Sequence, residues 1–417
     1  MDWSALLAEY GDAAKTALGF FWKAAWAFVL GYAISACIQA FVPKARLTKH
    51  MGHGAKSIGL ATFFGAASSS CSFAALSAAR ALLAKGASFI ATVAFMFAST
   101  NLVIELGILI FLFLGPGYLA AELVGGLVLI ATSALLIRLT APASLRERIR
   151  EHAEASAPDE PDDFDPWERM TSREGWRLVG HRFVMEWKMV WKEILIGFTV
   201  AGFMAVLVPD TFWQALFLTG RTDLPGWLVA LENALVGPLV AASTFIGSMG
   251  NIPLATVLAT SGTAFAGVMA FIYSDLMVPP IVRVNARYYG WKGALYIAGV
   301  MFVSIVVTAL ALNGAFAALE LTPAPPASVA ETTQFALDYT FWLNLAFAVV
   351  AVALFALHRR HLAGKSDERS EDEDEGDGGH DHDHDHEDGV DLQQGLAVAC
   401  ATIIALGLLT FAALELI

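Results

Sequence analysis

Long apolar runs separated by short polar segments fill most of this chain. Apolar runs of around twenty residues predict membrane-crossing helices, because about 20 helical residues span a hydrocarbon core of about 30 Å. We expect eight such spans, over residues 17–41, 88–114, 118–140, 190–210, 264–288, 291–312, 338–358 and 393–416. The predicted fold class is therefore an all-α polytopic membrane protein.

Two further apolar stretches, 57–85 and about 232–262, are interrupted in the middle by small polar residues. The first has Ser68-Ser-Ser-Cys-Ser72 at its centre, and hydroxyl groups in hydrocarbon need hydrogen-bond partners. Such a stretch either crosses as a helix that packs on small residues or turns back as a re-entrant hairpin. The tip of a hairpin would lie at mid-membrane depth.

The basic residues of the short loops favour the hairpins. Loops 43–56 and 138–150 are both basic, and basic loops tend to stay in the cytoplasm. A full span over 57–85 would place these loops on opposite faces, whereas a hairpin places both inside. If residues 232–262 also turn back as a hairpin, the basic segments 283–292 and 358–365 lie inside as well. We therefore predict two hairpins and eight spans, with both termini outside.

A shift of the chain by 176 residues supports the same topology. It aligns Ser72 with Ser248, Leu82 with Leu258, Gly86 with Gly262 and Phe89 with Phe265. Because the two hairpins would insert from opposite sides, this is an inverted-topology repeat, whose mid-membrane interface typically holds a substrate site. The expected parts are a first repeat (1–140), a cytoplasmic polar loop (141–187), a second repeat (188–312) and two added spans (313–417) with an acidic cytoplasmic loop (365–390).

Composition adds little outside the acidic loop. The chain is 57% hydrophobic with a mean hydropathy of +0.59 and a net charge of −13, and residues 367–388 alone hold 13 acidic residues against Arg369. The remainder is close to neutral, without a basic patch suited to nucleic acid. The three cysteines lie in apolar segments and suggest no disulfide framework. No GxxxxGK[ST] motif occurs, so transport would be coupled to an ion gradient or a partner.

The hairpin tips carry the first candidate site residues. The helix after each tip would point its N-terminal N–H groups at the membrane centre, an end that favours anions and thiolates. The alternative is that these residues only allow close helix packing, with the thiol buried and inert. The candidates are Ser69, Ser70, Cys71 and Ser72 in the first tip, and Ser248 and Asn251 in the second.

The spans after the hairpins carry the second set of candidates. Polar and ionisable groups inside a membrane are costly and often functional. Pro279-Pro280 would break backbone hydrogen bonds just after Asp275, which predicts an unwound segment there. For Glu105 the alternative is a position nearer the outer interface. The candidates are Ser99, Thr100, Asn101 and Glu105 in the first repeat, and Ser274 and Asp275 in the second.

The acidic loop contains a run of alternating His and Asp. Imidazole and carboxylate at this density bind Zn²⁺, Cu²⁺ or Ni²⁺ weakly, and the alternative is a solvated acidic linker. No cofactor is required by this interpretation. The candidate metal ligands are His380, His382, His384 and His386.

The stretch SSSCSFAALSAARALLAKGASFIATVAFMFASTNLVIELG resembles a permease family that includes ArsP, exporters of trivalent organoarsenicals, with relatives linked to copper or zinc efflux. The resemblance covers roughly residues 20–312 and is most specific at the Ser-Ser-Cys-Ser and Ser-Thr-Asn-Leu-Val segments. It implies an inner-membrane permease in which Cys71, Ser99, Thr100 and Asn101 lie on the substrate pathway. The stretch holds a single cysteine, so trithiolate coordination of arsenic would need both Cys37 and Cys400 nearby.

Together these patterns predict a multi-pass permease of the bacterial inner membrane that exports a thiophilic substrate, such as a trivalent arsenical, by alternating access with ion coupling. The alternative is a copper or zinc efflux transporter that uses the His/Asp loop as metal acceptor or sensor. A thiol enzyme built on Cys71 lacks a suitable nearby histidine, so we predict no enzymatic activity. The expected partners are the lipid bilayer and a small inorganic or organometallic substrate, with no nucleic acid, and a homo-oligomer remains open.

Overall fold

Every regular element in the part of the chain that the computed structural model describes is a helix. That part comprises residues 3–41, 54–68, 72–155, 165–221, 223–244, 246–324, 326, 328–372 and 387–415. Seven helices are long and apolar enough to cross a membrane, or up to eight if one bent pair is a single span. The predicted all-α polytopic fold is confirmed. The helices are α1 (Trp3–Phe41), α3 (Ala55–Ser68), α4 (Ser72–Ala84), α5 (Phe89–Asn101), α6 (Ile104–Phe113), α7 (Pro116–Thr140), α8 (Ala143–Glu154), α9 (Pro166–Thr171), α10 (Arg173–Leu207), α11 (Asp210–Leu216), α12 (Gly226–Thr244), α13 (Ser248–Thr260), α14 (Phe265–Ile272), the 3-10 helix η1 (Asp275–Met277), α15 (Pro279–Ala318), α16 (Val329–Thr332), α17 (Tyr339–Asp372) and α18 (Glu387–Glu415).

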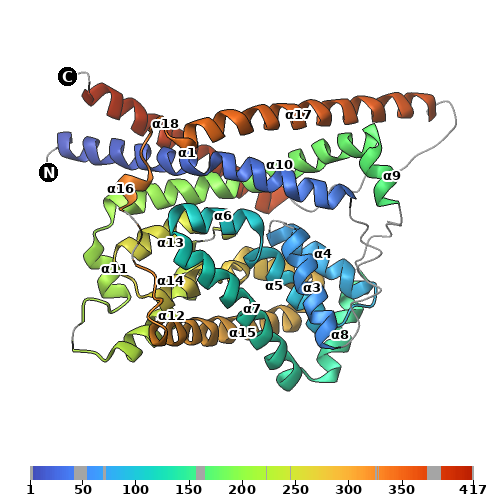
Figure 1. Cartoon of the computed structure of the whole chain (residues 1–417), viewed down its shortest axis with the longest axis horizontal. Helices are drawn as coiled ribbons and strands as arrows, with labels where there is room; N and C mark the ends of the chain where they lie inside the picture. Colours follow the sequence, from blue (N-terminus) through green and yellow to red (C-terminus); the bar gives the residue numbers. More distant parts are fainter. Residues whose placement is uncertain are drawn as a thin grey trace.

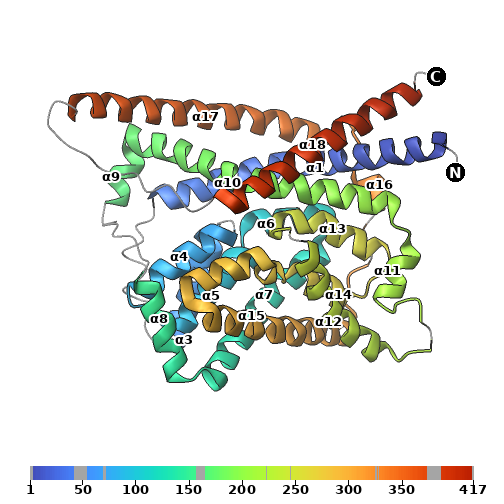
Figure 2. The same cartoon turned by 180° about the vertical axis from the view of Figure 1, so that it is seen from behind.

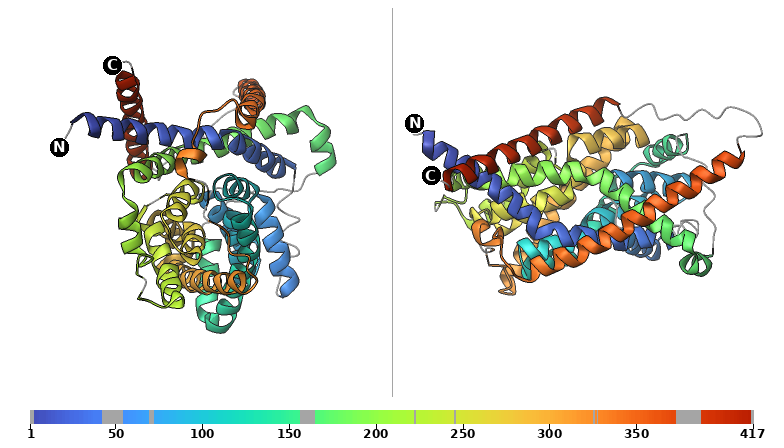
Figure 3. Two further views of the ribbon diagram at one scale, coloured as in Figure 1. Left: turned by 60° about the vertical axis from the view of Figure 1, so that its left-hand side comes forward. Right: turned by 90° about the horizontal axis from the view of Figure 1, so that it is seen from above.

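Four long helices form a layer along one side of the molecule. Helices α1 and α10 pack along each other, and both contact α17 and α18 (Figures 1 and 2). The shorter helices, together with α7 and α15, make up the body beneath this layer. The described ends of α1 and α18 lie at the same end of the layer (Figure 3), as expected if both termini are on one side of the membrane.

Helices α17 and α18 expose most of their apolar surface. Only 11% of the apolar window of α17 and 17% of that of α18 are buried, against 50% in α1. Side chains such as Val349, Val352 and Leu409 are about two-thirds exposed. A surface of this kind is compatible only with an apolar surrounding, so these two helices face lipid or another copy of the chain.

Two pairs of helices occupy the predicted hairpins, and three of the four helices are short. Helices α3, α4 and α13 have 14, 13 and 13 residues, a length of about 20 Å that cannot cross a core of about 30 Å. Helices α3 and α4 both pack against α5, as α12 and α13 both pack against α14. Helix α12, with 19 residues, is by itself long enough to span. The depth of both pairs in the membrane stays a prediction.

The boundaries of these elements follow the 176-residue shift. Helix α4 runs over 72–84 and α13 over 248–260, while α5 begins at 89 and α14 at 265. The turn after each second arm has a glycine with positive φ, Gly86 at 96° and Gly262 at 90°. In both turns a backbone N–H reaches back 3.0 Å to a leucine carbonyl, Leu82 or Leu258. This agreement supports an internal repeat, whose opposite insertion in the membrane stays a prediction.

The spans that follow the two hairpins are broken. The first consists of α5 and α6, bent by 40° between Asn101 and Ile104. The second consists of α14, η1 and the start of α15, which is interrupted at Gly290 with φ 72°. Helix α10 begins at Arg173, so residues 173–187 of the predicted polar loop are helical and continuous with the next span. The domain boundaries themselves stay predictions.

The hairpin topology can be tested by thiol labelling. Lys56 and Lys85 are exposed at the far ends of α3 and α4, so a hairpin places both on the cytoplasmic side. We expect Lys56→Cys and Lys85→Cys to react with an impermeant maleimide only after the cells are permeabilised. The matched outside control is Asp223→Cys, which lies in the exposed loop before α12 and should react in intact cells. Reaction of Lys56→Cys or Lys85→Cys alone in intact cells would mean that residues 57–85 cross the membrane.

Candidate functional site

Asp275 lies in the break of the second repeat, where α14 has ended and α15 has not begun. Pro279 and Pro280 open α15 and lack the N–H groups that would continue a helix backwards. The segment between the helices is a single 3-10 turn starting at Asp275. The predicted unwinding is confirmed. The side chain of Asp275 is completely buried, so its carboxyl group must be satisfied inside the protein.

The second arms of both hairpins begin at this carboxyl group. Ser72, the first residue of α4, donates a hydrogen bond of 2.8 Å to Oδ2 of Asp275 across 203 positions of sequence. Ser248, the first residue of α13, also interacts with the Asp275 side chain. A carboxylate is favoured at helix N-termini, so two helix ends converge on one acidic group. Oδ1 of Asp275 has no hydrogen-bond partner among the described residues.

Glu193 of α10 is a further acidic group at this place, and the sequence interpretation missed it. Its carboxyl group lies against the tip of the second hairpin, where a Cβ on Gly247 would come within 2.3 Å of Oε2 of Glu193. Glu193 and Asp275 interact electrostatically. An acid inside the predicted span 190–210 was the available signal. We refer to Asp275, Ser72, Ser248 and Glu193 as the Asp275 site.

Glu122 and Tyr273 extend the polar region away from the hairpin tips. Glu122 of α7 is 1% exposed and interacts electrostatically with Asp275 and with the Tyr273 hydroxyl. That hydroxyl donates a hydrogen bond of 3.2 Å to the carbonyl oxygen of Ala121. A Cβ on Gly125 would lie 2.1 Å from the Tyr273 oxygen, so a glycine is needed for this approach. Glu122 also stands inside a predicted span and was missed for the same reason as Glu193.

Glu105 belongs to a second buried acidic group between α1, α6 and α10. It is 1% exposed and packs against Gly31, where a Cβ would lie 1.8 Å from Cγ of Glu105. Glu186 of α10 interacts with it electrostatically and accepts a hydrogen bond from Gln39. Ser35 accepts a second hydrogen bond from Gln39 at 3.0 Å. Glu105 is therefore buried in the protein, while its depth in the membrane stays a prediction.

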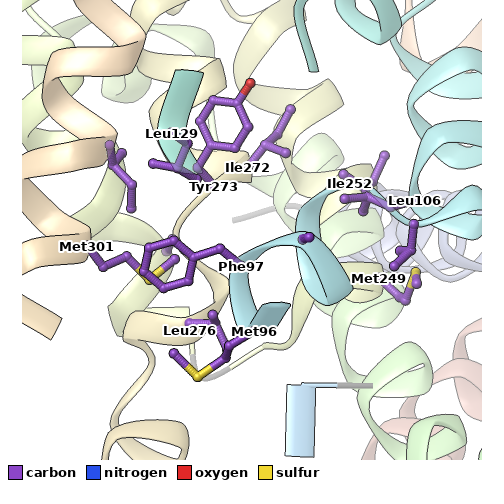
Figure 4. Close-up of a cluster of buried hydrophobic side chains, with 14 of the residues drawn as sticks. Met96, Phe97, Leu106, Leu129, Met249, Ile252, Ile272, Tyr273, Leu276 and Met301 are labelled. Atoms are coloured by element: carbon purple, nitrogen blue, oxygen red, sulfur yellow. The ribbon is translucent and has the colours of Figure 1, made fainter. Parts of the chain in front are cut away.

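The other polar candidates of the first repeat bond within their own helix. Ser99 and Thr100 donate to the carbonyl oxygen of Met96 at 3.0 and 3.3 Å, and Asn101 donates to that of Phe97 at 3.0 Å. Met96 of α5 and Leu276 of the break that contains Asp275 belong to one buried apolar cluster (Figure 4). Oδ1 of Asn101 is buried and has no partner among the described residues.

The remaining candidates make local hydrogen bonds, which leave their place on the pathway a prediction, or lie outside the described residues. Asn251 donates a 3.2 Å hydrogen bond to the carbonyl oxygen of Ile246, which closes the second tip. Ser274 donates to the carbonyl oxygen of Ala270 in the preceding turn. In the described part of the chain no group of three or more His, Cys, Asp or Glu could hold a metal ion. The candidates outside the described residues are Ser69, Ser70, Cys71, His380, His382, His384 and His386.

The apolar spans and the buried polar site between broken helices define a multi-pass membrane transport protein. A family model described as "Predicted permease" (ArsP_1) matches residues 9–314. The chain is also 39% identical over 306 residues to the "Putative permease Rv2963" of Mycobacterium tuberculosis (strain ATCC 25618 / H37Rv), an alignment that covers 71% of this chain and 74% of that protein. The chain belongs to the ArsP_1 family of permeases.

Proposed function

We propose that this permease exports a thiophilic substrate, with trivalent arsenicals as the substrate class, across the inner membrane by ion-coupled alternating access. The observation that carries this proposal is the hydrogen bond from Ser72 to Asp275. It joins the arm that follows Cys71 in the chain to a buried carboxyl group that Ser248 of the other hairpin also approaches. A soft sulfur ligand and a titratable oxygen ligand would then belong to one site.

The Asp275 site has features that suit an alternating-access transporter. Its groups come from both of the repeats that the 176-residue shift relates, so relative movement of the two repeats opens the site to one side of the membrane or the other. In a low-dielectric surrounding, Asp275 has to bind a proton, a cation or hydrogen-bond donors. Exchange of a bound proton for substrate at this carboxyl group would couple export to the proton gradient.

Replacement of Cys71 tests the substrate class. Cys71→Ser preserves size and hydrogen bonding but removes the soft sulfur. We expect cells with this variant to lose resistance to methylarsenite while the amount of protein in the membrane is unchanged. The matched comparison is Cys400→Ser on α18, a half-buried free thiol: full resistance there assigns the thiol ligand to Cys71, and loss in both variants indicates coordination by more than one thiol. The measurement is growth and efflux on a panel of methylarsenite, copper, zinc and cadmium.

The same panel distinguishes transition-metal efflux. If copper or zinc is the exported species, the parent chain itself gives no methylarsenite tolerance above that of the knockout, and metal tolerance depends on the loop. Deletion of residues 366–388 should then abolish tolerance to that metal. Full methylarsenite resistance in Cys71→Ser would reject thiol coordination of the substrate.

A further inference from the structure

A polar cavity lies between α9, the start of α10 and the part of α17 around His361, away from the Asp275 site. Its volume is about 350 Å³, within the range of small-ligand pockets. We refer to it as the α10–α17 cavity. Its lining residues are Arg169, Ser172, Glu174, Gly175, Leu178, His181, Arg182 and His361.

Contacts between histidines hold the part of α17 that lines the cavity against α10. Nδ1 of His181 lies 3.2 Å from Nδ1 of His358, and the two rings are stacked. The ring of His361, one helical turn further along α17, lies 4.9 Å from that of His181. These contacts hold the basic end of α17 against α10, so imidazoles from two helices stand beside the arginines.

Basic side chains outnumber acidic ones among the residues that line the cavity. Arg169 and Arg182 oppose the single carboxylate of Glu174, which stands in the first turn of α10 where a negative charge is favoured. Nε of Arg182 is buried and has no hydrogen-bond partner among the described residues, although its guanidinium interacts electrostatically with Glu186. Arg359 and Arg360 are exposed beside His361. An anion with several acceptor oxygens would accept hydrogen bonds from the two guanidinium groups that line the cavity.

Exposed tryptophans place the cavity at the membrane surface. Trp167 and Trp176 flank its lining residues and are 72% and 45% exposed, and Trp187 and Trp191 follow along α10 at 37%. Tryptophan collects at the level of lipid headgroups. The end of α17 is also the end that its basic residues assign to the cytoplasm, where the leaflet is rich in anionic lipid.

From the arginines of the cavity and these exposed tryptophans, we propose that the α10–α17 cavity binds the phosphate group of an anionic membrane lipid. The arginines hold the phosphate oxygens, and the acyl chains lie along the exposed apolar surface of α17. Bound lipid would join α17 to α10 on the cytoplasmic side. This inference does not depend on the transported substrate or on Asp275.

The test uses the purified full-length chain and titrates phosphatidylglycerol and phosphatidylcholine, with lipid binding measured by native mass spectrometry. We expect phosphatidylglycerol to bind at least about tenfold more tightly than phosphatidylcholine. Arg169→Gln and Arg182→Gln should each lower that affinity about tenfold, the loss expected for one charge-assisted hydrogen bond. The matched control, Arg146→Gln, changes an exposed arginine on α8 and should bind like the parent chain.

Three results would overturn the proposal. The first is an equal loss in Arg146→Gln, because lipid would then respond to overall charge. The second is unchanged affinity in both cavity variants. The third is displacement of phosphatidylglycerol by millimolar inorganic phosphate, which would make the cavity a site for a soluble anion.

Discussion

Asp275→Asn is expected to abolish the accumulation of substrate driven by a pH gradient. One proton exchanged per substrate sustains about a tenfold concentration ratio per pH unit, since one pH unit corresponds to about 1.4 kcal/mol. The amide cannot release or bind that proton, so the ratio should fall to about one. Asn keeps an acceptor for the hydrogen bond from Ser72, and we expect expression and assembly to be unchanged. The measurement is substrate uptake into everted vesicles at imposed pH gradients.

Two further variants make this result interpretable. Asp210→Asn changes an exposed acid at the start of α11 and should keep the full pH dependence. Glu193→Gln alters the second carboxyl group of the Asp275 site, which interacts electrostatically with the first. If Asp275→Asn keeps a tenfold ratio and Glu193→Gln loses it, the coupling proton belongs to Glu193. If both keep it, neither carboxyl group carries the proton.

The break at Asp275 was predictable because its causes are local. Two consecutive prolines lack the N–H groups that would bond to the preceding turn, so the helix is interrupted before them. An acid just before the prolines marks the unwound segment as a candidate functional site. The boundaries of α4 and α13 were likewise implied by the 176-residue shift, because equivalent sequence folds into equivalent elements. In both cases neighbouring residues decide the structure, and a single sequence contains that information.

The partners of Asp275 were harder to predict. Glu122 stands alone in an apolar span and Glu193 directly follows Lys192 at the start of another, and nothing local distinguishes a buried functional acid from one that faces a loop. Glu186 lies among charged residues and seemed part of a polar segment, yet it is 2% exposed. Only tertiary packing places these acids near Asp275 or Glu105. By contrast, the side chains of Ser99, Thr100 and Asn101 hydrogen-bond to carbonyl oxygens of their own helix. Serine, threonine and asparagine can make such bonds in any helix.

The close approach of α10 to the second hairpin leads to the last prediction. A Cβ on Gly197 would lie 2.5 Å from Cα of Gly250 and 2.8 Å from the Ile246 side chain. Both neighbours belong to the tip of the hairpin, and one of the two contacts is with backbone that cannot rotate away. Gly197→Ala therefore has to push α13 away from α10, which moves Gly247 and Ser248 away from the carboxyl group of Glu193 on α10.

We expect Gly197→Ala to lower the free energy of unfolding by about 1–3 kcal/mol, the usual cost of overpacking. The transport rate should fall by at least the factor that corresponds to this free energy. The control is Gly299→Ala, because a Cβ on this helical glycine of α15 meets nothing within 4 Å. Alanine should there stabilise the chain by roughly 0.4–1 kcal/mol, so the two variants differ in sign although the chemical change is the same. Thermal inactivation midpoints in lipid nanodiscs measure the difference. Equal midpoints for the two variants would show that the tip of the second hairpin does not rest on α10 as described, and the position of Glu193 beside Asp275 would have to be abandoned with it.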